Sequence, residues 1–108
     1  MSVLLEFSMF PTDKGESVSQ YVSQVIKMIR NTGVDYQLTP MGTVIETDNI
    51  NQALEIVGQA YDILDKLGCN RVYSSLKFDI RKGKTKRLSE KVKSVVEKIG
   101  KVSTVGEK

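Results

Sequence analysis

Stretches of β-prone residues predict four strands along the chain. Residues 2–10 are rich in β-branched, aromatic and large apolar side chains and end at a proline, which predicts a first strand. Residues 35–39 and 43–47 are two short β-prone runs around the Pro-Met-Gly sequence at 40–42, which is typical of a tight hairpin turn. Residues 71–80 alternate strictly between apolar and polar side chains, so this strand is expected to have one buried and one exposed face.

Apolar residues at intervals of three and four predict a helix after the first strand. They run from Val18 to Ile29, and the helix is expected to end at Gly33, because glycine readily adopts the left-handed conformation that closes helices. Ser17 and Gln20 have the spacing of a capping box, in which each side chain bonds the free backbone N–H of the other residue. An amphipathic helix is therefore predicted here.

Two further helices are predicted by the same criterion. The second has a wide apolar face over residues 50–67, and either Asp48 or Asn49 can cap it. The third is shorter, begins at Ser89 after a basic loop and ends at Gly100.

The predicted order is β-α-β-β-α-β followed by a short C-terminal helix. With two helices on one face of a four-stranded antiparallel sheet, this order gives a ferredoxin-like α+β sandwich. We expect a single domain over residues 1–100 and a disordered basic tail over residues 101–108. This topology serves many functions, so the activity has to be inferred from the side chains that the sheet carries.

The composition excludes several kinds of chemistry. The 108 residues include no histidine and one cysteine, Cys69. A histidine-based catalytic site, a zinc site built from thiols and an intrachain disulfide are therefore excluded, and we expect no metal site. No window of eighteen apolar residues could span a membrane, and the first ten residues lack the basic start of a signal peptide. A cytoplasmic location is expected.

The net charge of +3 is unevenly distributed along the chain. Residues 1–80 carry 6 basic and 10 acidic side chains, whereas residues 81–108 carry 10 basic and 3 acidic ones. A basic segment could contact nucleic acid. Lysines dominate here and no aromatic residue lies among them, so a solvated helix face and tail is the expected role.

Strand parity predicts which side chains point away from the two main helices. On the first strand Val3, Leu5, Phe7 and Met9 are expected to face the helices, because they are the alternate large apolar residues. The opposite face of the sheet, called here the open face, is then expected to mix large apolar side chains with polar and charged ones: Leu4, Glu6, Ser8, Phe10, Val44, Glu46, Tyr73, Ser75, Lys77 and Asp79.

This mixture predicts a partner subunit over the open face with a polar pocket between the two. A solvated face does not need large apolar groups, and a buried face does not tolerate unpaired carboxylates. Carboxylates in a partly apolar site favour a cationic or hydrogen-bond-donating ligand, such as an aminopyrimidine or a thiazolium ring. Lys77 is expected between Glu46 and Asp79. The alternative is an ordinary surface or intersubunit network of ion pairs.

Four short stretches occur in an order and at a spacing shared with a protein family. They are FSMFPT at the end of the first strand, ESVSQYV at the start of the first helix, TPMGTVIET in the hairpin, and SSLKFDIRKGK leading into SEKVKSV. On these stretches the chain resembles, over residues 3–100, the small thiamine-binding proteins of the YkoF-like, UPF0045 type. The hairpin stretch is the most specific of the four.

The resemblance implies a ferredoxin-like subunit that forms homodimers, and homotetramers as dimers of dimers, through its sheets. It also implies non-catalytic binding of thiamine or its hydroxymethylpyrimidine part, with no cofactor, by a carrier, sensor or salvage protein. The ligand positions that it implies are Ser8, Met41, Gly42, Thr43, Glu46, Ser75, Lys77 and Asp79.

Two of these implied ligand positions disagree in parity. Thr43 and Glu46 are three residues apart, so a regular strand places their side chains on opposite faces. Either the strand is bulged near Gly42, or one of the two residues is structural. Gly42 itself can be explained as a turn glycine.

Three other functions are compatible with this fold. RNA-recognition modules stack bases on aromatic residues of the central strands, and Phe10 and Tyr73 are candidates, but the acidic sheet face would repel phosphate. An enzyme of the acylphosphatase type would need an arginine in the loop after the first strand, and residues 8–20 contain none. The third alternative is a structural oligomer without a ligand.

Overall fold

The computed structural model describes residues 1–100, apart from the side chains of Ser89, Lys91 and Val92. The predicted order of elements is confirmed, and the predicted tail over residues 101–108 lies outside the described residues. No helix within residues 1–100 is long and apolar enough to cross a membrane. The elements are β1 (Ser2–Pro11), α1 (Ser19–Thr32), β2 (Asp35–Thr39), β3 (Gly42–Thr47), α2 (Ile50–Lys66), β4 (Val72–Arg81) and α3 (Arg87–Ile99).

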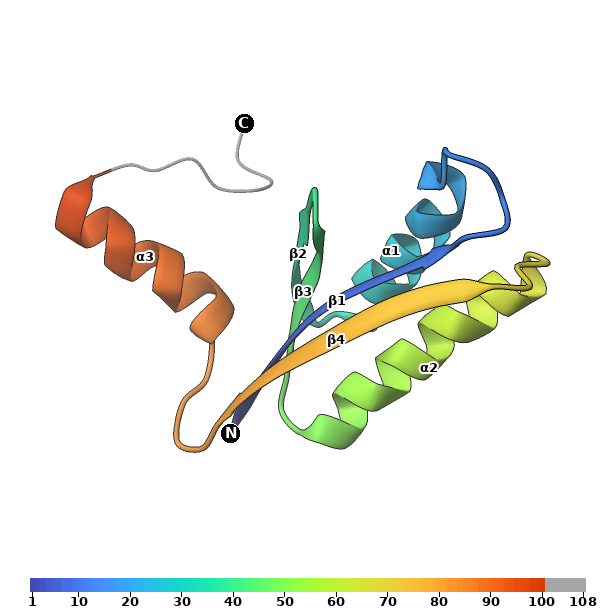
Figure 1. The fold of residues 1–108 in the computed structure, drawn as a ribbon. Helices are drawn as coiled ribbons and strands as arrows, with labels where there is room; N and C mark the ends of the chain where they lie inside the picture. The colour runs from blue at the N-terminus through green and yellow to red at the C-terminus, as the bar shows by residue number, and fades with distance from the viewer. Residues whose placement is uncertain (101–108) are drawn as a thin grey trace.

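The four strands form one antiparallel sheet in the order β2-β3-β1-β4, as expected for a ferredoxin-like fold. Helices α1 and α2 lie on one face of this sheet (Figure 1). Helix α3 lies on the other side, so part of the open face has a helix of its own. The short β2 and the long β4 are the two edges of the sheet.

The core lies between the sheet and helices α1 and α2. Alternate residues of β1 point into it, as the parity argument predicted, and small residues on α2 let that helix approach the sheet closely. The buried apolar residues are Val3, Leu5, Phe7, Met9, Val25, Ile29, Ile45, Ala53, Ile56, Ala60, Leu64 and Cys69.

The structure corrects the predicted start of α1 and decides that of α2. The side chain of Asn49 accepts the backbone N–H of Gln52 at 2.8 Å, so Asn49 caps α2. Helix α1 begins at Ser19 and has no side-chain cap, so the predicted capping box at Ser17 and Gln20 is wrong. The N-cap position is occupied by Val18, whose apolar side chain cannot accept a hydrogen bond.

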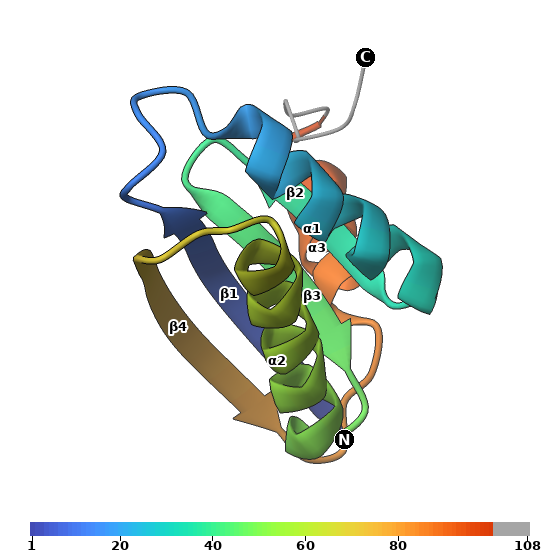
Figure 2. The ribbon, with the colours of Figure 1, turned by 90° about the vertical axis from the view of Figure 1, so that its right-hand side faces the viewer.

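The outer strand β4 is less covered than its alternating sequence predicted. Leu76 and Ile80 point to the same side as the core residues of β1, yet they are 40% and 46% exposed. Helix α2 packs over β1 and β3, and β4 lies beside it (Figure 2). Ser74 on this face is exposed as well, and Val72 and Phe78 are only half-buried, so the prediction of a buried face on this strand is wrong.

Candidate functional site

The strand register confirms the predicted composition of the open face. Leu4 lies opposite Glu46 on β3 and opposite Asp79 on β4. Ser8 lies opposite Ser75, with 3.2 Å between the two hydroxyl oxygens. The rings of Phe10 and Tyr73 also meet across the strands, with 5.9 Å between their centroids. All the residues expected on the open face therefore share that face.

Glu46 holds the first turn of α3 onto the open face. Its carboxylate accepts the backbone N–H of Arg87 at 2.9 Å and that of Leu88 at 3.1 Å. The hydroxyl of Ser2 donates a third hydrogen bond to the same carboxylate. A negative charge at the start of a helix satisfies free N–H groups and interacts favourably with the helix dipole. Glu46, a residue of β3, thus caps the N-terminus of α3.

These contacts lower the pKa of Glu46 below its ordinary value. Partial burial alone would raise the pKa, because it disfavours the charged form. The hydrogen bonds from Ser2, Leu88 and Arg87 favour the charged form, as does the positive charge of Arg87, and together they outweigh burial. Glu46 is therefore ionised at neutral pH.

Arg87 completes this attachment of α3. Its guanidinium donates to the hydroxyl of Ser2 at 2.9 Å and to the Ser2 carbonyl at 3.0 Å, and it forms an ion pair with Asp79 at 3.0 Å. Its side chain is 13% exposed. The expectation that the basic residues after position 80 are simply solvated is wrong for Arg87, because its charge is used within the fold.

The predicted position of Lys77 needs correction as well. Glu46 and Asp79 flank Leu4 in the sheet, whereas Lys77 lies opposite Glu6, two residues along β1. The Lys77 ammonium is 3.7 Å from the Glu6 carboxylate, and both side chains are largely exposed. The cation that pairs with Asp79 and lies beside Glu46 is Arg87.

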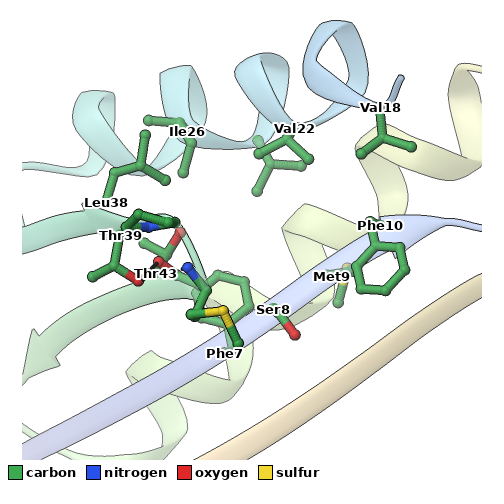
Figure 3. A pocket seen from close by; sticks show the side chains of 14 residues that line it. Phe7, Ser8, Met9, Phe10, Val18, Val22, Ile26, Leu38, Thr39 and Thr43 are labelled. Carbon is green, nitrogen blue, oxygen red and sulfur yellow. Dashed lines mark hydrogen bonds between the residues drawn. The ribbon is translucent and has the colours of Figure 1, made fainter. Parts of the chain in front are cut away.

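A pocket lies where α1, the end of β1 and the β2–β3 hairpin meet, and we call it the hairpin pocket. Its volume is about 430 Å³, within the range of small-molecule sites. Val18, just before α1, lies across from Phe10, and Ile26 of α1 lies near Leu38 on the other side of the pocket (Figure 3). The pocket residues are Phe7, Ser8, Met9, Phe10, Val18, Val22, Val25, Ile26, Leu38, Thr39, Pro40, Met41, Gly42 and Thr43.

The hairpin turn that closes this pocket is held by its own side chains. The hydroxyl of Thr39 accepts the backbone N–H of Met41 at 3.1 Å and donates to the carbonyl of Gly42 at 2.8 Å. A Cβ atom at Gly42 would lie 2.9 Å from the backbone oxygen of Phe7. Glycine is thus required at position 42 because the turn approaches β1 closely. Its role is therefore more specific than that of an ordinary turn glycine.

The structure decides between the alternatives for Thr43 and Glu46. Residues 43–47 pair one to one with β1, so β3 is not bulged there. Thr43 faces the helices and Glu46 faces away from them. Within the described residues Thr43 makes no side-chain hydrogen bond, and no buried side-chain oxygen there lacks a partner. The Thr43 hydroxyl is therefore accessible from the hairpin pocket.

The predicted ligand residues thus fall into separate groups. Ser8, Met41, Gly42 and Thr43 line the hairpin pocket, whereas Ser75 lies opposite Ser8 on the open face and does not line it. The other three, Glu46, Lys77 and Asp79, lie farther along the open face, where Glu46 and Asp79 hold α3.

Sequence reasoning missed the apolar wall of this pocket. Val22 and Leu38 line it, but the sequence indicated Val22 only as part of an amphipathic helix and Leu38 only as part of a short β-prone run. A usable signal was the proximity of the two motifs FSMFPT and TPMGT, which the antiparallel pairing of β1 and β3 brings together. Among the described residues, no three Asp, Glu or Cys side chains are grouped to hold a metal ion.

Comparison with known proteins gives a consistent result. The family described as thiamine-binding protein matches residues 5–96. A UPF0045 protein of Methanothermobacter thermautotrophicus is 35% identical over 83 residues, which cover 77% of this chain and 84% of that protein. The crystal structure of a hypothetical protein from Methanocaldococcus jannaschii superposes with a TM-score of 0.75 at 34% identity and covers 89% of this chain and 97% of that one.

A more distant solved structure shows the fold alone. It belongs to a proposed thiamine biosynthesis/salvage protein from Thermotoga maritima and has 19% sequence identity to this chain. Its TM-score is 0.74, and the match covers 88% of this chain and 99% of that one.

Proposed function

Because this chain belongs to the thiamine-binding protein family, we propose that it binds thiamine or its hydroxymethylpyrimidine part in the hairpin pocket, without catalysis. The observation that carries the proposal is that four of the ligand positions implied by the family resemblance, Ser8, Met41, Gly42 and Thr43, line one pocket. The family description supports a thiamine-related role. A carrier, sensor or salvage protein needs binding of this kind and no chemical step.

The lining of the pocket suits an aminopyrimidine ring. Val22, Ile26 and Leu38 supply apolar walls against which a flat heteroaromatic ring can pack. The amino group of the ring is a hydrogen-bond donor, and the hydroxyl of Thr43 is an acceptor without a partner in the described chain. Ser8 lines the same pocket from the strand that crosses its floor.

The open face would contribute to the binding site by contacting a second subunit. The rings of Phe10 and Tyr73 make a tilted contact at the end of this face that lies nearest the hairpin pocket, and Tyr73 is 60% exposed. A homo-oligomer that covers them would close the pocket from the side of Ser8 and Ser75. The pairs Lys77–Glu6 and Arg87–Asp79 keep the charges of this face partnered within the chain, which lowers the cost of covering it.

Isothermal titration of the full chain with thiamine and with hydroxymethylpyrimidine tests the proposal. Saturable heat is expected with at least one of them. Thr43→Val keeps the shape of the side chain and removes its hydroxyl, so it should weaken binding by about 5-fold, which corresponds to one hydrogen bond. The matched control is Ser23→Ala, because that hydroxyl bonds only the carbonyl of Gln20 on the outer side of α1.

Two results would count against the proposal. One is the absence of heat with both compounds. The other is equal binding by wild type and Thr43→Val, which would place the ligand away from this hydroxyl. Equal weakening in Ser23→Ala would show that the loss of affinity arises from a general change in the protein.

A further inference from the structure

A second hollow adjoins the hairpin pocket along the outer side of α1. We call it the α1 groove; its volume is about 490 Å³, and its lining includes Ile26, Lys27, Arg30 and Leu38. Val22, Ile26 and Leu38 line both hollows, so the two meet at these three side chains. Ile26 and Leu38 lie near each other at this boundary (Figure 3), and Leu38 is 44% exposed. A ligand in the hairpin pocket can therefore extend past Leu38 into the α1 groove.

The two hollows differ in charge. The hairpin pocket is lined by apolar side chains, hydroxyls and a glycine, and none of its lining residues is charged. The α1 groove is lined by two cations, Lys27 and Arg30, and by no Asp or Glu. These two residues are three positions apart, so their side chains are neighbours on the helix surface. The combined hollow thus has an apolar inner part and a cationic outer part.

Neither cation is neutralised by a carboxylate of the described chain. The ion pairs among the described residues include neither Lys27 nor Arg30. Helix α1 contains no Asp or Glu, although residues 1–80 carry 10 acidic and 6 basic side chains. A hollow lined by charges of one sign raises the local concentration of ions of the opposite sign. The α1 groove is therefore suited to an anionic group.

We propose that the α1 groove holds a phosphate group of the bound ligand, so that the preferred ligand is a phosphate ester of the pyrimidine rather than the free alcohol. This inference rests on the proposed function, because it names a substituent of the ligand in the hairpin pocket. Along α1, Lys27 and Arg30 lie about 1.5 and 6 Å beyond Ile26, at 1.5 Å per residue. A ring packed against Ile26 thus places its substituent beside both cations.

The two cations match the chemistry of a phosphate ester. The ester carries about two negative charges at neutral pH, one for each cation. Arginine offers a planar pair of N–H donors to two phosphate oxygens, and lysine offers a point charge. The thiazolium ring of free thiamine is a cation and gains nothing from this groove. The groove therefore favours the phosphorylated ligand.

Isothermal titration of the full chain with hydroxymethylpyrimidine and with its phosphate ester tests the inference. The phosphate ester should bind about tenfold more tightly, which is the size expected of two exposed ion pairs. This ratio of affinities should fall as the salt concentration rises, because salt screens exposed charges.

Charge reversal locates the phosphate. In Lys27→Glu the ratio of the two affinities should fall to about one, because the new carboxylate repels the phosphate. Arg30→Gln should lower the ratio by about threefold, the share of one ion pair. The matched control is Lys66→Glu, which makes the same change of charge in the last turn of α2, at an exposed residue that lines neither hollow. It should keep the tenfold ratio.

A preference for the phosphate ester that is lost in Lys27→Glu and kept in Lys66→Glu would support the inference. Equal binding of the two compounds by the wild type would overturn it and leave the proposed function standing. A preference that Lys27→Glu retains, or that Lys66→Glu loses equally, would overturn it as well, because the phosphate would then not lie in the α1 groove. Absence of heat with both compounds would overturn the proposed function and this inference together.

Discussion

The carboxylate of Glu46 accepts the backbone N–H of Leu88, a residue 42 positions later in the chain. Glu46 belongs to β3 and Leu88 to the first turn of α3, so this contact fixes the C-terminal helix against the open face of the sheet. A tertiary contact thus replaces the local cap that α3 lacks, since the side chain of its own N-cap residue does not cap the helix. The charge of Glu46 is therefore one of the contacts that fix α3, together with those of Arg87.

Glu46→Gln is expected to loosen α3. The substitution keeps the shape of the side chain but removes the charge that faces the helix dipole and two backbone N–H groups. The attachment of α3 should lose about 1–2 kcal/mol, measured as faster amide hydrogen exchange in α3. Glu55→Gln on the exposed side of α2 is the control. Unchanged exchange in α3 of Glu46→Gln would contradict this account of the attachment.

The attachment of α3 should also depend on pH. The pKa of Glu46 is lower in the folded protein than its ordinary value of 4.5. Its contribution is therefore complete above about 4.5 and is lost as the pH falls through the lowered value. The difference in hydrogen exchange of α3 between wild type and Glu46→Gln should be large near neutral pH and should shrink in acid. A difference that is constant with pH would contradict this assignment.

Arg87→Lys should weaken α3 although it keeps the positive charge. The guanidinium donates to the hydroxyl and the carbonyl of Ser2 and pairs with Asp79, and one ammonium group cannot reproduce this planar arrangement. A loss of about 1 kcal/mol in the protection of α3 is expected. Arg30→Lys, which changes an exposed residue in the last turn of α1, should have no effect on α3.

Gly42→Ala and Gly58→Ala are expected to change stability in opposite directions. At Gly42 the new methyl group would lie 2.9 Å from the backbone oxygen of Phe7, so the hairpin must move away from β1, at a cost of about 1–3 kcal/mol. At Gly58, within α2, no atom lies within 4 Å of the new group, and the stability should rise by about 0.4–1 kcal/mol. Urea unfolding measures both. A stabilised Gly42→Ala would show that the hairpin does not need this close approach.

Periodicity predicted most of the fold because the strongest signals were local. The alternation in β1 identified Val3, Leu5, Phe7 and Met9 as core residues, and all four are buried. The same parity placed Ser8 and Glu46 on the open face. These predictions depend only on a residue's own strand and on the side of the sheet that the helices cover.

Features that depend on contacts between distant segments could not be predicted. The start of α3 was expected at Ser89, but the cap comes from Glu46, and the helix begins at Arg87. Leu76 and Ile80 were expected to be buried because they belong to the apolar face of an alternating strand. Alternation shows that such a face exists, but it does not show which element packs over it. The hairpin pocket likewise combines three elements, and only two of its motifs were visible in the sequence.

Amide chemical-shift mapping with thiamine and with hydroxymethylpyrimidine tests the central proposal most directly, because it reports where a ligand binds as well as whether it binds. We predict saturable shifts that are largest at Ser8, Met41, Gly42 and Thr43, with smaller ones in α1. Shifts confined to the loop before α3, or no shifts with either compound at millimolar concentration, would contradict binding in the hairpin pocket.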